Sequence, residues 1–271
     1  MIHITLAQLN SNDDIHSNLK KVLELVDEAG TQDPKPDLIF FPENTLFFRM
    51  NVSEKMEGLA LNSGFWNPLK EKAKLLSIPI HLTTALLDSD GKIYNGSVLI
   101  HSSGELEVVY RKIHLFDISL SGQKPIRESD AFQFGTKSVV FEIKGFKFGS
   151  SICYDVRFSE LYSKYAQAEV DVILVPSAFL VKTGEAHWHI LLRARAIESQ
   201  CYVLAAAQAG THVSTRMSEQ RQTFGHTLAV GPWGQILQEK AEGVGLINVK
   251  LTKTEIQQVR TQIPMKAHRR L

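Results

Sequence analysis

The chain has 271 residues, of which 44% are hydrophobic and 22% are charged. This composition excludes a disordered tail or a miniature scaffold, because enough apolar residues are present to bury a sizeable core. Thirty basic residues against twenty-nine acidic ones leave a formal net charge of +1. We therefore expect neither nucleic acid nor an anionic membrane as the main partner.

The sequence shows no sign of export. No basic N-terminal region is followed by a long apolar run, and no stretch of eighteen apolar residues occurs, so we expect neither a secretory signal nor a membrane span. The two cysteines, Cys153 and Cys201, have different surroundings that do not favour a mutual disulfide. A reducing, cytoplasmic setting is therefore predicted.

Strand-like apolar runs alternate along the chain with segments whose apolar residues recur every three or four positions. No flexible linker separates the two halves, so one domain with mixed sheets and outer helices is predicted. In the first half, the expected elements are strands 2–9 and 37–41, helices 15–26 and 65–76, and an antiparallel meander of strands 78–87, 94–102 and 106–115. In the second half, they are a hairpin over 139–152, helices 158–168, 185–200 and 254–263, and strands 171–176, 201–208, 225–230, 235–239 and 246–249.

Three charged residues could take part in chemistry. Glu43 follows the apolar run 37–41, which places a carboxylate at the rim of a sheet. Partly apolar surroundings raise the pKa of a carboxylate and suit a general base, while an acidic residue in an exposed turn is an equally weighted alternative. Lys112 stands near the end of a strand, where a solvated lysine is the usual outcome. Glu128 stands in a polar loop, and its position alone predicts no role.

Cys153 lies between the strand-like segment 148–152 and the expected helix 158–168. A thiol at such a turn faces a helix N-terminus, whose partial positive charge favours the thiolate and whose N–H groups can bind an oxyanion. Cys201 lies within an apolar strand, where a buried inert thiol is expected. From these surroundings alone, catalytic and structural roles for Cys153 are about equally supported.

Other catalytic constellations find little support. The sequence contains no G-x-S-x-G elbow, no G-x-x-x-x-G-K-[ST] loop and no G-x-G-x-x-G motif. His187 and His189 would point to different faces of a helix, and no cysteine pair has zinc-ligand spacing, so no metal site is expected. A Cys–His dyad with His114, His212 or His226 stays open, because spacing does not select among them.

Three motifs together resemble the catalytic blocks of the nitrilase superfamily of carbon–nitrogen hydrolases. They are Phe-Pro-Glu at 41–43, Tyr-Arg-Lys-Ile-His-Leu-Phe-Asp at 110–117 and Ile-Cys-Tyr-Asp-Val-Arg-Phe at 152–158, in the family's order. The resemblance spans nearly the whole chain, since further family-like segments occur at 94–97, 176–179, 225–226 and 232–234. Within the superfamily, the segments most similar to deaminated-glutathione amidases lie at 186–189, 192–202 and 205–208.

This resemblance implies a four-layer αββα sandwich formed by one domain over residues 1–271. It implies Cys153 as the nucleophile and Glu43 as the general base, with Lys112 and the backbone N–H of Tyr154 holding the oxyanion. Glu128 is expected to orient Lys112 or the substrate amide. No metal or organic cofactor is implied. The resemblance also implies a homodimer or a higher oligomer, with the helices 158–168 and 185–200 as candidates for the interface.

The implied substrate is a small-molecule amide, above all deaminated glutathione, cleaved to 2-oxoglutarate and cysteinylglycine through a thioester. Arg157, Lys182 and Arg195 are the candidate partners of its carboxylate, and the sequence does not rank them. Tyr154 and Phe179 complete the expected substrate-binding set. The charges at 182–185, around an expected turn, depart from the family pattern.

Three alternative functions stay open at this stage. The first is an omega-amidase that acts on 2-oxoglutaramate or 2-oxosuccinamate. The second is a catalytically silent nitrilase-fold binding module, and the third is a nitrile hydrolase with the same nucleophile.

Overall fold

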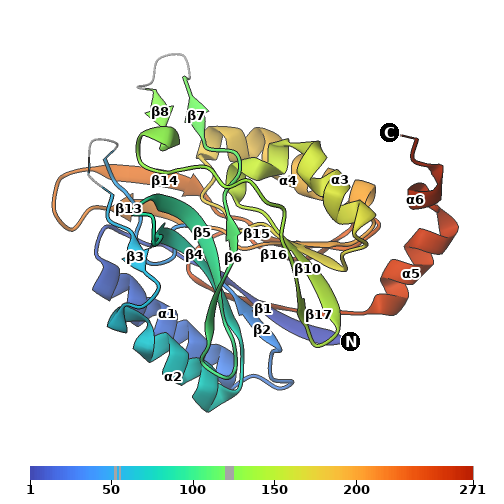
Figure 1. The fold of residues 1–271 in the computed structure, drawn as a ribbon, viewed down its shortest axis with the longest axis horizontal. Coiled ribbons are helices and arrows are strands. Elements are labelled where there is room, and N and C mark those ends of the chain that lie inside the picture. Colours follow the sequence, from blue (N-terminus) through green and yellow to red (C-terminus); the bar gives the residue numbers. More distant parts are fainter. Residues whose placement is uncertain (52–53, 55, 120–124, 271) are drawn as a thin grey trace.

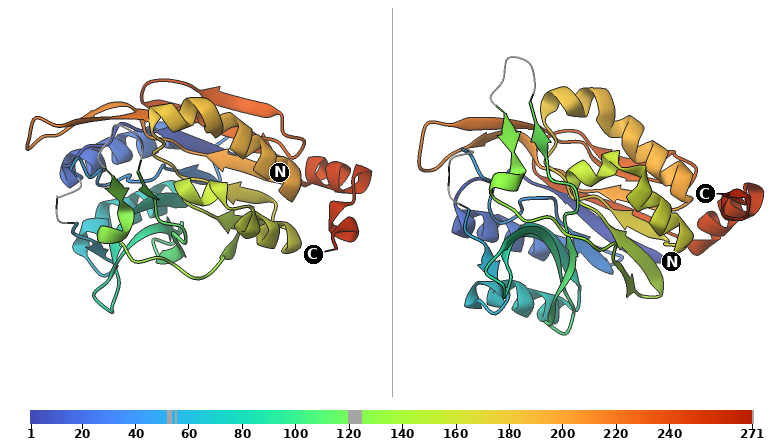
Figure 2. Two further views of the ribbon diagram at one scale, coloured as in Figure 1. Left: turned by 90° about the horizontal axis from the view of Figure 1, so that it is seen from above. Right: turned by 45° about the horizontal axis from the view of Figure 1, so that its top comes forward.

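The computed structural model describes residues 1–51, 54, 56–119 and 125–270. Two β-sheets lie face to face at its centre (Figure 1, Figure 2). The helices α1 (Ile15–Gly30) and α2 (Asn67–Leu76) cover the outer side of one sheet, and α3 (Ser159–Gln167) and α4 (Val181–Ser199) cover the outer side of the other. This arrangement is the four-layer αββα sandwich that the sequence predicts. None of the helices in the described ranges is long and apolar enough to cross a membrane.

The first sheet is built by the N-terminal half and completed by a strand from near the C-terminus. Its strand order is β17-β1-β2-β4-β5-β6, and the short β3 pairs with β4. β1, β2 and β4 run parallel, whereas β4, β5 and β6 form the predicted antiparallel meander. Its strands are β1 (Ile2–Gln8), β2 (Leu38–Phe40), β3 (Leu59–Ala60), β4 (Ile80–Leu87), β5 (Ile93–Ile100), β6 (Leu106–Arg111) and β17 (Gly245–Leu251).

The second sheet has the order β16-β15-β12-β11-β10-β9, in which β10, β11 and β12 run parallel. Its strands are β9 (Val140–Ile143), β10 (Phe146–Ser150), β11 (Val172–Leu174), β12 (Tyr202–Ala205), β15 (Thr227–Val230) and β16 (Ile236–Lys240). Two small ladders stand apart from both sheets: β7 (Asp117–Ile118) with β8 (Ile126–Arg127), and β13 (Ala209–Val213) with β14 (Gln220–Phe224). Both ladders extend from the body of the sandwich (Figure 1).

The helices begin and end largely where local sequence predicts. Asp14 accepts a hydrogen bond from the N–H of His16 and so caps α1, which satisfies one of the unpaired N–H groups of its first turn. The helices are α1 (Ile15–Gly30), α2 (Asn67–Leu76), α3 (Ser159–Gln167), α4 (Val181–Ser199), α5 (Lys253–Gln262) and α6 (Met265–His268), with 3₁₀ turns η1 (Gly64–Trp66), η2 (Glu128–Asp130) and η3 (Cys153–Arg157).

Alternation along the strands divides the apolar core into layers. Leu38 and Phe40 of β2 face the second sheet, whereas Ile39 packs beneath α1 and α2, as the two-residue period of a strand requires. The layer between the sheets also contains Val172 and Leu204 from the second half of the chain. Both halves therefore share one core.

Several regions differ from the sequence-based expectation. The strand predicted at 106–115 ends at Arg111, and the β7–β8 ladder was not predicted. α4 begins at Val181 instead of residue 185. Gly184 is a packing position within this helix and not a turn residue, since a Cβ there would lie 2.2 Å from Cγ of Phe224. The residues 182–185 are thus helical and do not form the expected turn. The β13–β14 hairpin was not predicted, since its polar sequence carries no clear apolar alternation.

Candidate active site

The candidate site lies where strands from both sheets end. Glu43 follows β2, Lys112 follows β6 and Cys153 follows β10. All three line one pocket, so the topology brings together residues that are far apart in sequence. β2 and β10 each belong to the parallel part of their sheet, and the carboxyl ends of parallel strands are the usual position for a ligand site in α/β folds.

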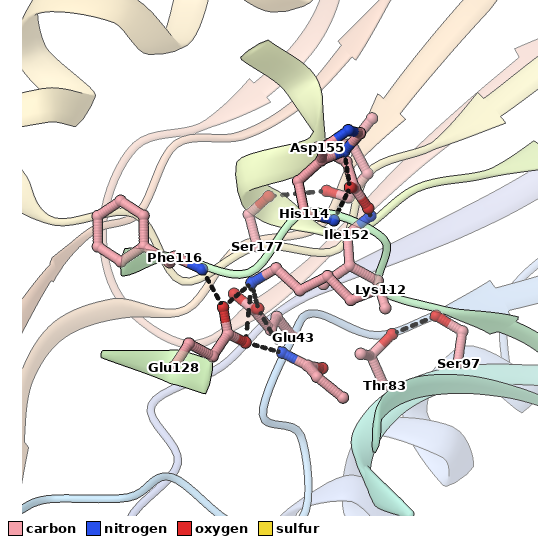
Figure 3. Close-up of polar contacts among 12 residues, drawn as sticks. Glu43, Thr83, Ser97, Lys112, His114, Phe116, Glu128, Ile152, Asp155 and Ser177 are labelled. Atoms are coloured by element: carbon pink, nitrogen blue, oxygen red, sulfur yellow. Dashed lines mark hydrogen bonds and ion pairs between the residues drawn. The ribbon is translucent and has the colours of Figure 1, made fainter. Parts of the chain in front are cut away.

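The ammonium of Lys112 is held between two carboxylates (Figure 3). Its Nζ lies 2.9 Å from Oε1 of Glu43, and 3.0 and 2.8 Å from Oε1 and Oε2 of Glu128. Lys112 is 2% exposed, which rules out the solvated strand-end lysine. Burial lowers its pKa, but attraction to Glu128 and Glu43 outweighs burial and raises the pKa well above the ordinary value. Lys112 is therefore a cation at neutral pH.

Other donors fix the two carboxylates. Nδ2 of Asn95 donates to Oε1 of Glu43 at 2.9 Å and to Oε1 of Glu128 at 2.8 Å. The N–H of Phe116 donates to Oε2 of Glu128 at 2.6 Å. Glu43 is 3% exposed, so it does not lie in an exposed turn, and Nε2 of Gln208 donates to its backbone carbonyl at 2.9 Å. The sequence motifs contain Asn95 and Gln208, yet their spacing gave no reason to assign them to the site.

Cys153 is the first residue of η3 and has a φ of 48°. A non-glycine residue in this left-handed region is uncommon and is strained, and such residues cluster at functional sites. Its N–H donates to the carbonyl of Pro176 at 2.9 Å, which ties the turn to the end of β11. The next residue, Tyr154, carries a backbone N–H in the first turn of η3, where N–H groups have no partner within the helix.

Burial opposes the thiolate that a helix N-terminus was expected to favour at Cys153. Burial raises the pKa of its thiol well above the ordinary value, the charge of Glu43 raises it further, and the attraction of Lys112 does not compensate. Glu43 and Cys153 line the same pocket, so the carboxylate acts directly on the thiol. At neutral pH the sulfur therefore keeps its proton, with a carboxylate beside it.

A fully buried carboxylate joins the Lys112 segment to the Cys153 turn (Figure 3). Oδ2 of Asp155 accepts from the hydroxyl of Tyr110 at 2.9 Å and from the N–H of Ile152 at 2.9 Å. Its Oδ1 accepts from the N–H of His114 at 2.9 Å and lies 2.7 Å from Nδ1 of that ring. Asp155 therefore fixes the end of β6 against the turn that carries the thiol. Sequence reasoning did not identify this role.

Three of the five expected substrate-binding residues line the pocket, and two do not. Tyr154, Arg157 and Phe179 contribute to its wall. Lys182 is exposed on the first turn of α4 and is not part of the wall. Arg195 is buried elsewhere, where its Nε donates to a backbone carbonyl at 2.8 Å and its guanidinium lies over a tyrosine ring. Its role is structural, and neither cation is placed to contact a ligand in this pocket.

Two other arginines line the pocket and were missed. Arg49 follows the Glu43 motif in an irregular loop, and Arg221 comes from the unpredicted strand β14. Nη1 of Arg221 donates to the carbonyl of Arg49 at 2.6 Å. Neither position stands in a segment whose pattern could have drawn attention to it.

Among the described residues, no histidine lines the pocket that contains Cys153, which removes the support for a Cys–His dyad. Elsewhere, His189 and His226 each contact Oε1 of Glu239, at 2.8 and 2.5 Å. The potential ligand atoms of these three residues lie within 4.8 Å of one another, an association that their spacing in sequence did not predict. Hydrogen bonds to the shared carboxylate account for this cluster.

The two-sheet sandwich and a pocket with a thiol, two carboxylates and an ammonium define a hydrolase of the nitrilase type. The family model for carbon-nitrogen hydrolases matches residues 3–261, and the chain belongs to this family.

Relatives and solved structures agree with this assignment. The chain is 38% identical to the deaminated glutathione amidase of Mus musculus, over 98% of this chain and 83% of that protein. It is 35% identical to the deaminated glutathione amidase of Yersinia enterocolitica, over 99% and 93%. The crystal structure of the C. elegans NitFhit protein matches with a TM-score of 0.86 and 32% identity, covering 99% of this chain and 65% of that one.

Proposed function

We propose that this protein is an amidase that hydrolyses deaminated glutathione to 2-oxoglutarate and cysteinylglycine. One observation carries the chemistry: a buried ammonium lies between the carboxylates of Glu43 and Glu128, in the same pocket as the thiol of Cys153. Relatives at 35 to 38% identity that carry the name deaminated glutathione amidase support the choice of substrate.

In the first step, Glu43 takes the proton from Sγ of Cys153 as the sulfur attacks the amide carbon. The neutral resting thiol and the adjacent carboxylate suit this transfer. Negative charge develops on the former carbonyl oxygen, where the ammonium of Lys112 and the N–H of Tyr154 stabilise it. Each such donor typically contributes about 10²- to 10³-fold in rate.

In the second step, Glu43 gives its proton to the nitrogen of the departing amine, and the C–N bond breaks to leave a thioester on Cys153. Glu43 then removes a proton from water, whose oxygen attacks the thioester carbon. Release of the acid returns the proton to the thiol. Water is the only co-reactant, and we propose that the cycle needs neither a metal nor an organic cofactor.

Glu128 acts as a positioning residue in this scheme. Both of its oxygens accept from Lys112, and they also accept from Asn95 and from the N–H of Phe116.

We assign the carboxylate of the 2-oxo acid to Arg157. This arginine lines the pocket four residues after the nucleophile, and its guanidinium lies over the rings of Tyr154 and Phe179, at 5.7 and 5.4 Å. Stacking restricts the guanidinium to one plane. Its Nη1 lies 3.2 Å from Nδ1 of His187, and the remaining N–H groups are left for contact with a carboxylate.

A substrate comparison tests the proposal. Release of 2-oxoglutarate from deaminated glutathione should be much faster than from 2-oxoglutaramate, and Cys153→Ala should abolish both reactions. A reversed order would assign the protein to the omega-amidases. Absence of turnover with both amides and with a nitrile would instead support a silent binding module.

We also propose a homodimer that pairs through α3 and α4. α4 exposes Ile190 and Ile197, at 70% and 48%. Trp233 is 55% exposed and precedes Gly234, which packs on Ile197. These are unusual apolar side chains for a solvated surface. Analytical ultracentrifugation of Ile190→Glu beside the parent protein tests this: the variant should be a monomer, and an unchanged dimer would contradict the proposed interface.

Two further proposals concern the whole chain. Cys153 and Cys201 are free and buried, which supports a reducing, cytoplasmic compartment; fractionation of the cells that make the protein tests this. The core shared between the sheets supports a single domain over residues 1–271. Coincident unfolding transitions by fluorescence and circular dichroism would agree with one domain, and separate transitions would not.

A further inference from the structure

The pocket wall contains three arginines that have no carboxylate partner. Arg49, Arg157 and Arg221 line the pocket, and none of them forms an ion pair within the described part of the chain. Other arginines do: Arg111 pairs with Asp88 at 2.6 Å, and Arg195 pairs with Glu198 at 2.7 Å. Together with Lys112, the three arginines of the wall give the pocket four cations against the two carboxylates of Glu43 and Glu128, and this excess of positive charge favours an anionic ligand.

Arg221 is held firmly in its position. Nη1 donates to the carbonyl of Arg49, and the guanidinium lies 5.0 Å from the centre of the Phe48 ring. Burial lowers the pKa of Arg221 and the neighbouring Arg49 lowers it further, yet a guanidinium stays charged at neutral pH. The two arginines thus form a fixed site of positive charge on one wall.

The pocket therefore contains two cationic positions. Arg157 packs against Tyr154 and Phe179, whereas Arg221 and Arg49 lie together beside Phe48. The proposed function assigns the carboxylate of the 2-oxo acid to Arg157. The second cationic position is then left for an anion on the leaving group.

We propose that Arg221, supported by Arg49, binds a carboxylate on the leaving-group side of the substrate. The inference rests on the proposed function and makes it more specific: the preferred substrates carry an anion on each side of the amide. A 2-oxo acid joined to a dipeptide meets this requirement. A primary amide such as 2-oxoglutaramate does not, because its leaving group is ammonia. Arg221 is thus a specificity-determining residue.

A double comparison of enzyme and substrate tests the proposal. Deaminated glutathione and its C-terminal carboxamide differ only in the leaving-group carboxylate, so the ratio of their kcat/KM values isolates that contact. We expect the parent enzyme to prefer the acid by about 10- to 100-fold, as a charge-assisted hydrogen bond typically gives. In Arg221→Gln the ratio should fall to about one, mainly through KM, and Arg221→Lys should restore part of it.

Arg216→Gln is the matched control, because Arg216 precedes the same strand but pairs at the surface with Glu54 at 3.4 Å; its ratio should equal that of the parent. A ratio near one in the parent, or an undiminished ratio in Arg221→Gln, would overturn the proposal. If the parent hydrolyses neither the acid nor the carboxamide, the proposed function itself fails, which is a distinct result.

If Arg221→Gln does not fold, product inhibition of the parent enzyme tests the proposed carboxylate site instead. Inhibition by cysteinylglycine but not by its C-terminal amide supports the site. Equal inhibition by both would overturn it.

Discussion

Nζ of Lys112 contacts both carboxylate oxygens of Glu128, at 3.0 and 2.8 Å. With Glu43, Nζ contacts only Oε1, at 2.9 Å, and the charge of Glu43 also acts on the thiol of Cys153. This asymmetry supports different roles for the two carboxylates: donors occupy both oxygens of Glu128, whereas Glu43 also acts on the thiol whose proton moves in the proposed cycle.

Replacement of either glutamate by glutamine, which has the same shape but no charge, should therefore have different effects at the two positions. Glu43→Gln removes the proposed general base and should lower kcat by about 10²- to 10⁴-fold. Glu128→Gln disturbs only the position of Lys112 and should cost at most about 10²-fold. Single-turnover trapping of the thioester distinguishes the roles: its formation should be abolished in Glu43→Gln and only slowed in Glu128→Gln. The opposite pattern would exchange the roles.

Removal of the ammonium should impair both catalysis and folding. Lys112→Met loses one oxyanion donor, which should lower kcat by about 10²- to 10³-fold, and leaves two buried carboxylates side by side. The raised pKa of Lys112 means that its stabilising effect is complete below the unfolded pKa of about 10.4 and is lost as pH rises through the folded value. Urea denaturation at pH 8 should show a less stable variant; equal stability at that pH would contradict the ion-pair geometry.

The raised pKa of Cys153 predicts slow and strongly pH-dependent alkylation. The rate of reaction with iodoacetamide should keep rising through pH 9 without a plateau, because the thiolate fraction is small throughout. Peptide mapping should place the label on Cys153 and not on Cys201, which burial makes a poor nucleophile. A plateau below pH 7 would indicate a resting thiolate instead.

His81 predicts a loss of stability in acid. It is fully buried beside Phe40, its ring nitrogens have no partner among the described residues, and burial lowers its pKa to about 3. In the unfolded chain, the imidazole of His81 binds a proton near pH 6.5, whereas in the folded chain it stays neutral until the pH approaches 3. The free energy of unfolding therefore decreases as pH falls from about 6.5 towards 3. The free energy of unfolding can be measured for His81→Phe and for the parent by chemical denaturation. The value for the variant, relative to that of the parent, should be higher at pH 5 than at pH 8. An equal difference in stability at pH 5 and pH 8 would contradict this prediction.

Much of the fold could be predicted from sequence because its strands are short apolar runs buried on both faces, such as Leu38–Phe40. The start of α4 could not, because Gly184 reads as a turn residue until the ring of Phe224 is seen to pack on it. The β13–β14 hairpin was missed because its two strands are joined by backbone pairing and do not form an apolar face that the sequence would reveal.

For the site, the motifs identified Glu43, Lys112 and Cys153, and the structure brings them into one pocket. Motifs did not reveal which cations complete the wall. Arg195 has the same charge as Arg221, but long-range packing buries the first against a backbone carbonyl and turns the second into the pocket. The protonation state of Cys153 also depends on burial, which the expected turn geometry did not include.

The formation of a thioester on Cys153 is the central claim, and rapid-quench mass spectrometry tests it most directly. When the enzyme is mixed with deaminated glutathione and quenched in acid during turnover, a 2-oxoglutaryl adduct should appear on the peptide that contains Cys153. Cys153→Ala should show neither adduct nor turnover. Turnover that continues in Cys153→Ala, or an adduct that forms equally in both proteins, would contradict the account.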